Sequence, residues 1–498
     1  MFYTSTRDNS VKVSASKAIA DGISKEGGLY IPESIPVLSA EDIKALCSAD
    51  YKERAKKVLG LYLTDFSKEE LDYCVDGAYA DGKFASAAVA PVVKLHDNVS
   101  ILELFRGPTC AFKDMALQIL PYLLTVSAKK NLKDKEIVIL VATSGDTGKA
   151  ALEGFKDVAG TKILVFYPVD GVSPMQKLQM TTQEGANVGV CAIEGNFDDA
   201  QTGVKSIFTN QEILKRFEEN NLVFSSANSI NWGRLAPQIV YYVSAYCDMV
   251  NSGDVKFGDP INVVVPTGNF GNILAAYFAK EMGIPINKLI CASNANNVLT
   301  DFINTGVYDR NRSFFATTSP SMDILISSNL ERLLYILCGR DDATINQWFS
   351  ALKENGEYTV SDDVKSQIQS LFAAGCCDDD ATKLTIGETY KMYDYLADTH
   401  TSVGINVCNA YIEATGDKTP VVVASTASPF KFSKAVLSAV ESEPKVYDDE
   451  FSTVKALEDI SGLTAPSQLS ALKGKEVRFT KVTSKDDMAQ VVFDMLGI

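Results

Sequence analysis

The feature that most constrains the fold is an alternation, beginning near Ser100, of short continuous apolar runs with segments of helical spacing. Apolar runs that lack a polar face are typical of strands buried on both sides, as in parallel sheets covered by helices. The pattern therefore predicts an α/β fold with parallel sheets. Its strand candidates are Ile137–Ala142, Ile163–Tyr167, Val188–Ile193, Val223–Ser225, Ile261–Val265, Leu289–Ala292 and Val421–Ala424, and its helix candidates include Met115–Leu124, Gly148–Phe155 and Ile273–Met282.

Two regions depart from this alternation. Residues 1–95 are mixed, with short helical patterns, and near residues 310–400 the sequence is mostly helical and polar. A chain of 498 residues is too long for one ordinary core. We predict an N-terminal α+β domain over residues 1–95 and an α/β domain over 96–227. A second α/β domain over 228–498 would include a mostly helical insertion near 310–400.

The composition argues against several kinds of partner. With 47 basic and 63 acidic side chains the formal charge is −16, which disfavours binding to nucleic acid. No apolar run approaches the roughly 18 residues of a membrane span, and the N-terminus lacks the pattern of a secretory signal. The ten cysteines contain no CxxC pair, as is typical of thiols in a reducing compartment. We expect a cytoplasmic monomer, with a dimer as the alternative.

Histidine is scarce, since only His96 and His400 occur in the whole chain. A clustered histidine metal site is therefore excluded, and no metal is expected. A Ser-His-Asp or Cys-His arrangement would need one of these two residues, and neither lies in a nucleophile elbow or a zinc motif. An enzyme this poor in histidine is expected to take its reactivity from a cofactor.

Lys113 is the candidate reactive amine. It follows the rigid turn Gly107-Pro-Thr109 and Phe112, at the predicted start of the apolar helix Met115–Leu124. A lysine near a helix start is usually a solvated surface residue. This helix must be buried, however, and both desolvation and the positive end of a helix dipole lower the pKa of an ammonium group. A lysine with a lowered pKa is the usual partner of an aldehyde.

Two glycine-containing loops each follow a predicted strand and open a predicted helix. There, backbone N–H groups and the helix dipole converge on a small anion. The loop at residues 268–272 contains no lysine, which argues against a Walker-type nucleotide site and favours a phosphate monoester. The second loop taken alone is equally typical of a capped helix start, and its alternative role is to hold a substrate carboxylate. The phosphate loop is Gly268, Asn269, Phe270, Gly271 and Asn272, and the second is Ser144, Gly145, Asp146, Thr147 and Gly148.

With these motifs the chain resembles threonine synthase of the longer bacterial and fungal type. The family consists of pyridoxal-phosphate enzymes of fold type II (tryptophan synthase β-like), which implies two parallel-sheet domains and an N-terminal extension domain. The glycine loops are generic to that fold, whereas the Gly-Pro-Thr…Phe-Lys-Asp string and Asn228-Ser-Ile-Asn-Trp232 are specific to the family. Other matching strings are Tyr3-Thr-Ser-Thr-Arg7, Gly27-Gly-Leu-Tyr-Ile-Pro32 and Ser425-Thr-Ala427.

The resemblance implies roles for individual residues. Lys113 would bind the cofactor aldehyde covalently and move protons at the substrate carbons. The phosphate loop would hold the cofactor phosphate, and Thr426 would hydrogen-bond the pyridine nitrogen. The candidates for the substrate phosphate are Asn228, Asn231 and Arg234, of which Arg234 offers two parallel donors.

The implied reaction converts O-phospho-L-homoserine and water to L-threonine and phosphate. Where family members often have histidine, this chain has Arg106 and Ser428, which puts a proton-relay role at those positions in doubt. Two alternatives stay open. One is a lyase for a phosphorylated amino compound, or a serine/threonine dehydratase, on the same fold. The other is a catalytically silent amino-acid sensor, which intact Lys113 disfavours.

Overall fold

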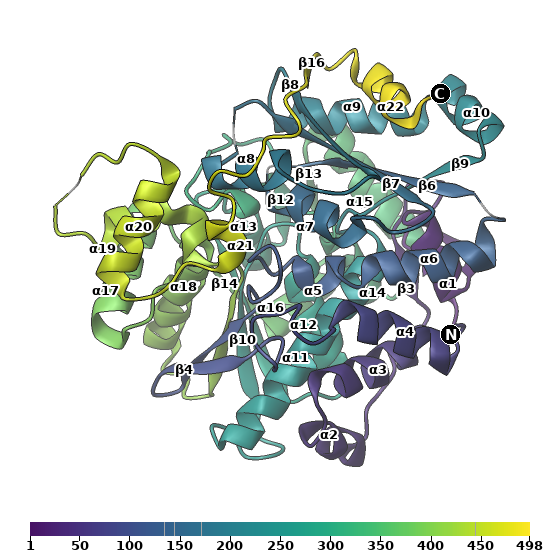
Figure 1. Cartoon of the computed structure of the whole chain (residues 1–498). Coiled ribbons are helices and arrows are strands. Elements are labelled where there is room, and N and C mark those ends of the chain that lie inside the picture. Colours follow the sequence, from purple (N-terminus) through teal and green to yellow (C-terminus); the bar gives the residue numbers. More distant parts are fainter. Residues whose placement is uncertain (134, 144, 171, 444) are drawn as a thin grey trace.

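The larger of two parallel sheets crosses the middle of the molecule (Figure 1). The computed structural model describes residues 1–133, 135–143, 145–170, 172–443 and 445–498. The larger sheet has six strands, all parallel except β4, which runs antiparallel to β5. In spatial order they are β14 (Phe372–Cys376), β11 (Ile286–Ser293), β10 (Ile261–Pro266), β15 (Val421–Ser425), β5 (Val99–Glu103) and β4 (Val92–His96).

The second sheet is parallel throughout and has five strands. In spatial order they are β16 (Val482–Thr483), β8 (Val188–Ile193), β7 (Thr161–Pro168), β6 (Glu136–Ala142) and β9 (Leu222–Ser225). Every strand candidate of the sequence therefore lies in one of the two sheets, and the predicted α/β class is confirmed. The division at 95/96 and 227/228 stays a prediction. The larger sheet combines β4 and β5 with strands that come after residue 260.

Helices cover both sheets. The central one is α11 (Trp232–Ser252), which is buried along most of its length and contacts helices of the N-terminal region. The others before residue 300 are α1 (Ala15–Asp21), α2 (Ala40–Cys47), α3 (Tyr51–Tyr62), α4 (Lys68–Ala78), α5 (Asp114–Leu117), α6 (Leu120–Asn131), α7 (Asp146–Phe155), α8 (Pro174–Thr181), α9 (Phe197–Thr209), α10 (Gln211–Glu219), α12 (Gly271–Glu281) and α13 (Val298–Thr305).

The helix predicted over Met115–Leu124 is two helices, α5 and α6, and this prediction was wrong in its continuity. Pro121 lies in the first turn of α6. Proline has no backbone N–H, so it cannot donate the hydrogen bond that would continue α5. The break keeps α5 to a single turn directly after Lys113.

The N-terminal region packs onto the rest of the chain through a short antiparallel sheet of β2 (Asp8–Val13), β1 (Tyr3–Ser5) and β3 (Tyr30–Pro32). Tyr3 is buried edge-on against Trp232, with ring centroids 5.4 Å apart. Arg7 makes two hydrogen bonds to the buried carboxylate of Glu331, at 2.9 and 2.8 Å. The Tyr-Thr-Ser-Thr-Arg string is thus a docking segment.

The segment near 310–400 is mostly helical, as predicted, but it also contributes the edge strand β14 to the larger sheet. Asp378, the first of three consecutive aspartates, caps α17 (Asp379–Tyr393) by accepting from the Ala381 N–H at 2.9 Å. The elements from residue 306 to 416 are β12 (Val307–Asp309) paired with β13 (Glu357–Thr359), the 3-10 helix η1 (Pro320–Met322), α14 (Leu330–Leu337), α15 (Asp342–Asn355), α16 (Asp362–Leu371), α17 (Asp379–Tyr393) and α18 (Thr399–Thr415).

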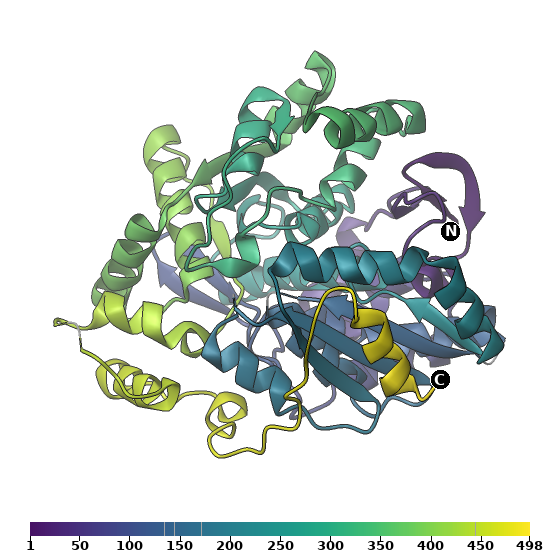
Figure 2. The same ribbon diagram turned by 90° about the horizontal axis from the view of Figure 1, so that it is seen from above.

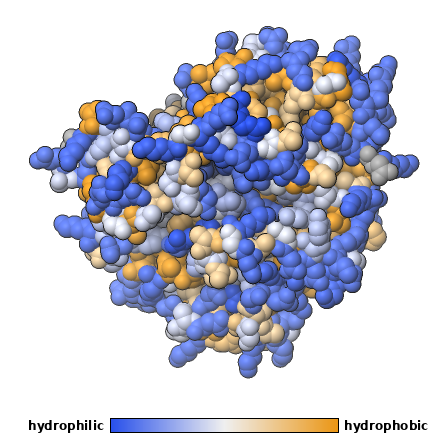
Figure 3. Space-filling model, in the orientation of Figure 1, coloured by the Kyte–Doolittle hydropathy of each residue, from blue (hydrophilic) through white to orange (hydrophobic). Residues whose placement is uncertain are grey.

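The C-terminal segment returns to the smaller sheet, and Figure 2 shows it in yellow along that sheet. Its last strand, β16, pairs in parallel with β8. The face seen in Figure 3 is mostly hydrophilic, with apolar atoms in separate patches. No described helix is long and apolar enough to cross a membrane. The elements of this segment are the 3-10 helix η2 (Pro429–Phe432), α19 (Ser433–Val440), α20 (Glu450–Ser461), α21 (Ser467–Ser470), β16 and α22 (Met488–Leu496).

Candidate active site

Lys113 lies in the interior, immediately before α5, with 8% of its surface exposed. Its amine donates to Ser321 Oγ at 2.9 Å and lies 3.7 Å from Asp146 Oδ2. The loop before it is held by Asp114, whose carboxylate accepts from the Thr109 N–H at 2.8 Å and hydroxyl at 2.7 Å. A Cβ on Gly107 would lie 2.5 Å from that carboxylate, so glycine is required in this turn.

The pKa of Lys113 is lowered to about 8, and burial is the largest cause; Asp146 opposes this lowering, whereas the nearby cations Arg234 and Lys431 add to it. The predicted lowering of the Lys113 pKa is confirmed. The expected helix dipole contributes little to it, because α5 has only four residues. Desolvation is the main cause.

The phosphate loop follows β10 and opens α12, as predicted. Phe270 caps α12 in the left-handed region at φ 61°, a conformation that is uncommon for residues other than glycine. A Cβ on Gly268 would lie 2.6 Å from the Ser321 carbonyl oxygen, so the loop packs directly against η1. Ser327 Oγ donates to the Gly268 carbonyl at 2.7 Å, and Asn329 Nδ2 donates to the Asn269 carbonyl at 3.0 Å.

Asn272 has an unsatisfied donor in this loop. Its Oδ1 accepts from the hydroxyls of Tyr241 and Tyr242, at 2.6 and 2.5 Å, which fixes the orientation of the amide. Its Nδ2 is buried and has no hydrogen-bond partner among the described residues. A buried donor without a partner carries a cost that an anion in the loop would relieve. The loop therefore fits a phosphate group.

The second loop includes Ser144, which lies outside the described residues. In the remainder, the Gly145 and Gly148 N–H groups donate to Thr143 Oγ1 at 2.9 and 3.0 Å, and Thr147 is half-buried in the first turn of α7. These two glycine donors are thus already used within the protein. The role of this loop toward a substrate carboxylate stays a prediction.

Asp146, the first residue of α7, lies between two amines. Its Oδ1 is 2.6 Å from Lys431 Nζ and accepts from Gln176 Nε2 at 2.9 Å, while its Oδ2 faces Lys113. Burial alone would raise the pKa of this carboxyl, but Lys431 and Lys113 together hold it well below its ordinary value. Asp146 is therefore a fixed negative charge at the lysine.

Arg234, in the first turn of α11, is buried with 4% of its surface exposed. One terminal nitrogen donates to the Ala227 carbonyl at 2.8 Å, and Nε has no partner among the described residues. Burial lowers the pKa of this guanidinium to about 10. Asn231 caps α11 and donates to two carbonyls, so its amide is occupied within the protein, and Asn228 is half-buried next to it.

Thr426 comes directly after β15 and is buried. Its carbonyl accepts from the Phe112 N–H at 2.8 Å, and Ala111 and Ala427 form an antiparallel bridge. The end of β15 is thereby joined to the residue before Lys113. Lys113, the phosphate loop, Arg234 and Thr426 come from different parts of the sequence, and the first two meet at Ser321.

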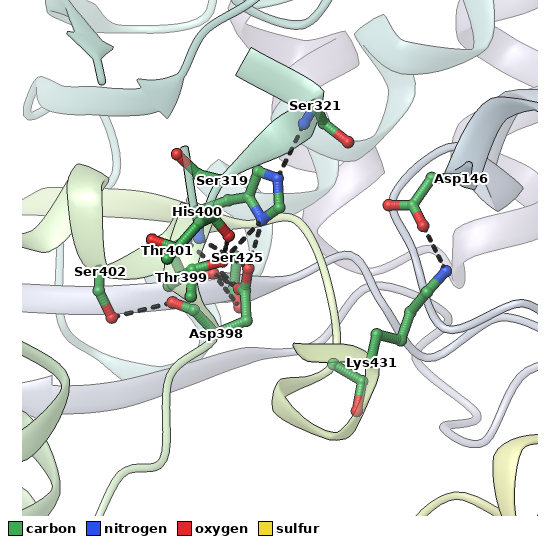
Figure 4. A network of polar contacts seen from close by, with 12 residues as sticks. Asp146, Ser319, Ser321, Asp398, Thr399, His400, Thr401, Ser402, Ser425 and Lys431 are labelled. Atoms are coloured by element: carbon green, nitrogen blue, oxygen red, sulfur yellow. Dashed lines mark hydrogen bonds and ion pairs between the residues drawn. The ribbon is translucent and has the colours of Figure 1, made fainter. Parts of the chain in front are cut away.

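Sequence reasoning missed several residues of this region. Lys431, on η2, is fully buried and holds Asp146 and the Thr109 carbonyl, the latter at 3.0 Å (Figure 4). Ser321 and His400 also went unrecognised as neighbours of Lys113. One available signal was that Lys431 follows the carboxyl end of a predicted parallel strand, where ligand sites of α/β folds gather.

Exchanging Asp146 for asparagine is expected to destabilise the fold by about 3 kcal/mol, because it leaves the buried ammonium of Lys431 without a carboxylate. Urea unfolding followed by circular dichroism measures the change. Asp50→Asn is the matched control. Asp50 only caps α3 at the surface, where asparagine caps equally well, and the expected change is below about 0.5 kcal/mol. Equal effects of the two exchanges would contradict the assignment of a buried ion pair.

Comparisons with known proteins cover nearly the whole chain. Residues 2–79 match the family model described as threonine synthase N terminus. Residues 91–346 match the model of pyridoxal-phosphate dependent enzymes, and residues 401–492 match that of the threonine synthase C-terminal region.

Individual relatives and solved structures also match over most of the chain. Threonine synthase of Pseudomonas aeruginosa is 39% identical over 444 residues, covering 88% of this chain and 90% of that protein. Threonine synthase-like 1 of Homo sapiens is 41% identical over 86% of this chain, which spans 59% of that protein's length. The crystal structure of threonine synthase from Brucella melitensis with bound pyridoxal phosphate matches with a TM-score of 0.87 at 37% identity, covering 99% of both chains. The yeast enzyme matches with a TM-score of 0.89 at 32% identity, covering 100% of this chain and 99% of that one.

Proposed function

Because this chain belongs to the threonine synthase family, we propose that it converts O-phospho-L-homoserine and water to L-threonine and phosphate. The observation that carries the proposal is a buried amine, Lys113, which lies near the phosphate loop and near the buried cation Arg234. An amine of this kind suits a cofactor aldehyde, and a buried guanidinium with a free donor suits a second phosphate.

The proposed cofactor is pyridoxal phosphate, which supplies an electron sink for negative charge that develops next to the amino group of the substrate. Lys113 would hold its aldehyde carbon. The phosphate loop, residues 268–272, would hold its phosphate with main-chain donors and Asn272 Nδ2. Thr426 would hydrogen-bond its ring nitrogen with a neutral hydroxyl.

The reaction requires proton transfer, phosphate binding and exclusion of water from the residues of this chain. Lys113 would take the proton from Cα and move protons at Cβ and Cγ, since its lowered pKa leaves part of the amine neutral near pH 7. Arg234 would bind the phosphate that leaves Cγ. The buried walls of the site exclude bulk water until one water molecule adds at Cβ.

The direct test is the formation of L-threonine and inorganic phosphate from O-phospho-L-homoserine by the purified holoenzyme, measured by chromatography and a phosphate assay. L-Serine and L-threonine, assayed for keto-acid formation, serve as comparators. Equal stoichiometric amounts of threonine and phosphate are expected. Phosphate release without threonine would instead indicate a phospho-compound lyase, keto acid from serine a dehydratase, and cofactor binding without turnover a sensor.

The attachment of pyridoxal phosphate to Lys113 is expected to follow the neutral fraction of an amine with a pKa of about 8. Its rate should rise about tenfold per pH unit below pH 8 and level off above it. An amine with the ordinary value of 10.5 would keep accelerating to higher pH. Borohydride trapping at several pH values, with mass spectrometry of the Lys113 peptide, measures this dependence. An unbroken rise beyond pH 9 would contradict the proposed desolvation of Lys113.

A further inference from the structure

The imidazole of His400 lies in the interior, close to the residue that Lys113 contacts (Figure 4). His400 is the second residue of α18, and its Nε2 lies 3.2 Å from the backbone nitrogen of Ser321. Ser321 Oγ in turn accepts from Lys113 Nζ at 2.9 Å. Two hydrogen bonds through one serine therefore connect the histidine to the lysine.

The backbone geometry decides which nitrogen of His400 carries the proton. A backbone N–H is always a donor, so Nε2 must accept from Ser321 and must be unprotonated. The proton of the neutral ring is then on Nδ1, which lies 2.9 Å from Asp398 Oδ1. A carboxylate at Nδ1 favours this tautomer and fixes the plane of the ring.

Asp398 is itself immobilised. It caps α18 by accepting from the backbone N–H groups of His400 at 2.8 Å and Thr401 at 3.3 Å, and it also accepts from the Thr401 hydroxyl. The side chain is fully buried. Because the cap and the imidazole share one carboxylate, the position of the ring is set by the start of α18.

Ser321 contacts both Lys113 and the phosphate loop. Its hydroxyl accepts a hydrogen bond from Lys113. Its carbonyl oxygen lies so close to Gly268 that a Cβ on that glycine would be 2.6 Å away. The two ends of the short helix η1 are held by Asn294, which donates to the Ser319 carbonyl and to Asp323. The hydrogen bond from Ser321 N to His400 adds support from α18 at the serine itself.

The amine of Lys113 has two acceptors in reach, Ser321 Oγ at 2.9 Å and Asp146 Oδ2 at 3.7 Å. The charged groups that face it are Asp146 from α7, Arg234 from α11 and Lys431 from η2. If the serine were displaced, the carboxylate would be the remaining acceptor. An amine that turned toward Asp146 would be held as an ammonium group, which is not a nucleophile.

We propose that Asp398 and His400 are positioning residues that hold Ser321, and that the Ser321 hydroxyl in turn orients the Lys113 amine toward the cofactor aldehyde. The inference rests on the proposed function for the identity of that aldehyde. The placement of the amine does not depend on which substrate is used, so attachment of pyridoxal phosphate tests it separately from turnover.

The test compares five variants of the full chain, four single and one double, by the rate at which pyridoxal phosphate attaches to cofactor-free protein, a condensation that releases water. His400→Leu removes the acceptor for Ser321, whereas His400→Gln keeps an acceptor near the position of Nε2. Ser321→Ala removes only the hydroxyl, and His96→Gln changes the other histidine, which lies on β4 and stacks on Tyr393. Thermal unfolding monitors folding.

His400→Leu and Ser321→Ala are expected to slow attachment and to lower kcat by about 100-fold with little change in KM, as misplacement of a reacting group does. His400→Gln should restore most of the rate, and His96→Gln should equal the unaltered protein. Adding His400→Leu to Ser321→Ala should cause no further loss, because the histidine acts through the serine.

Three results would overturn the inference: attachment by His400→Leu at the unaltered rate, equal losses in the Leu and Gln variants, or additive losses in the double variant. If His400→Leu fails to fold, Ser321→Ala and His400→Gln still decide the matter. Normal attachment in Ser321→Ala then counts against the inference. A protein that attaches the cofactor as expected but forms no threonine would refute the proposed function alone.

Discussion

Exchanging Lys113 for alanine is expected to abolish covalent attachment of pyridoxal phosphate and to lower turnover of O-phospho-L-homoserine by at least about 10,000-fold. The reason is that one amine serves both purposes. Lys113 is buried, its pKa is lowered to about 8, and it lies against the serine that backs the phosphate loop. Reduction with borohydride followed by peptide mass spectrometry locates the adduct, and a threonine assay measures turnover.

Lys149→Met is the matched control. Lys149 is also a buried lysine with a pKa lowered by burial, but its amine is held by Glu153 at 2.9 Å and by Gln183. This variant is expected to be less stable, yet to carry the adduct on Lys113. An adduct on Lys149, or residual adduct in Lys113→Ala, would show that burial alone selects the lysine and would refute the assignment of Lys113.

The sheets and glycine loops were predictable because their signals are local. The fully buried strand β10 is apolar at every position except Asn262, and the Gly268–Asn272 turn comes soon after it in sequence. The burial of Lys113 was predictable for the same reason, since Gly107, Pro108 and Phe112 are its close neighbours in the chain. In each case a few adjacent residues determine the conformation.

The supporting contacts could not be predicted, because they join residues that are far apart in sequence. Ser321 meets Lys113 across 208 positions, and Lys431 meets the Thr109 carbonyl across 322. Nothing in the strings around Ser321 or His400 distinguishes them from ordinary cap residues. Asp398 is such a residue, and although it contacts His400 only two positions away, that histidine meets Ser321 across 79 positions.

Arg106 and Ser428, at the two positions where family members often have histidine, are both held by hydrogen bonds. Arg106 donates twice to the buried carboxylate of Glu103, at 2.8 and 2.5 Å. Ser428 caps η2, and its N–H donates to the Cys110 carbonyl at 3.0 Å. Neither substitution leaves the site without an imidazole, because His400 contacts Ser321.

Positive charge in this site is unusual for so acidic a protein. The chain has a formal charge of −16, which repels an anionic substrate at long range. Lys431 is neutralised by Asp146, whereas Arg234 forms no ion pair with any described residue. A buried guanidinium without a carboxylate is costly for folding, and a substrate phosphate is the partner that would repay this cost.

Arg234→Met is therefore expected to reduce activity strongly while changing stability little. Catalytic efficiency (kcat/KM) for O-phospho-L-homoserine should fall by about 100- to 1,000-fold, the usual effect of removing one partner of a buried charge pair. The free energy of unfolding of the substrate-free protein should not decrease by more than about 1 kcal/mol, because methionine fills a similar volume without an unpaired charge. Steady-state kinetics and urea unfolding measure the two effects.

The same variant also predicts a shift in pH dependence. Arg234 is one of the cations that lower the pKa of Lys113, so its removal should raise that pKa above about 8. The pH at which cofactor attachment reaches half its maximal rate should therefore move upward. Arg332→Met is the matched control. Its nitrogens donate to the Tyr30 and Ile230 carbonyls and to Asn329 Oδ1, so this exchange should cost about 3 kcal/mol of stability.

Arg332 donates from all three of its nitrogens, whereas Arg234 Nε has no partner among the described residues. This difference decides how the two variants are interpreted. If Arg234→Met lost stability as Arg332→Met does, the guanidinium would be a structural element of α11. If kcat/KM for the phosphorylated substrate were unchanged while the protein stayed folded, another group would have to bind the leaving phosphate. The expected result, a stable protein that attaches the cofactor yet processes its substrate poorly, requires that Arg234 be retained for the ligand.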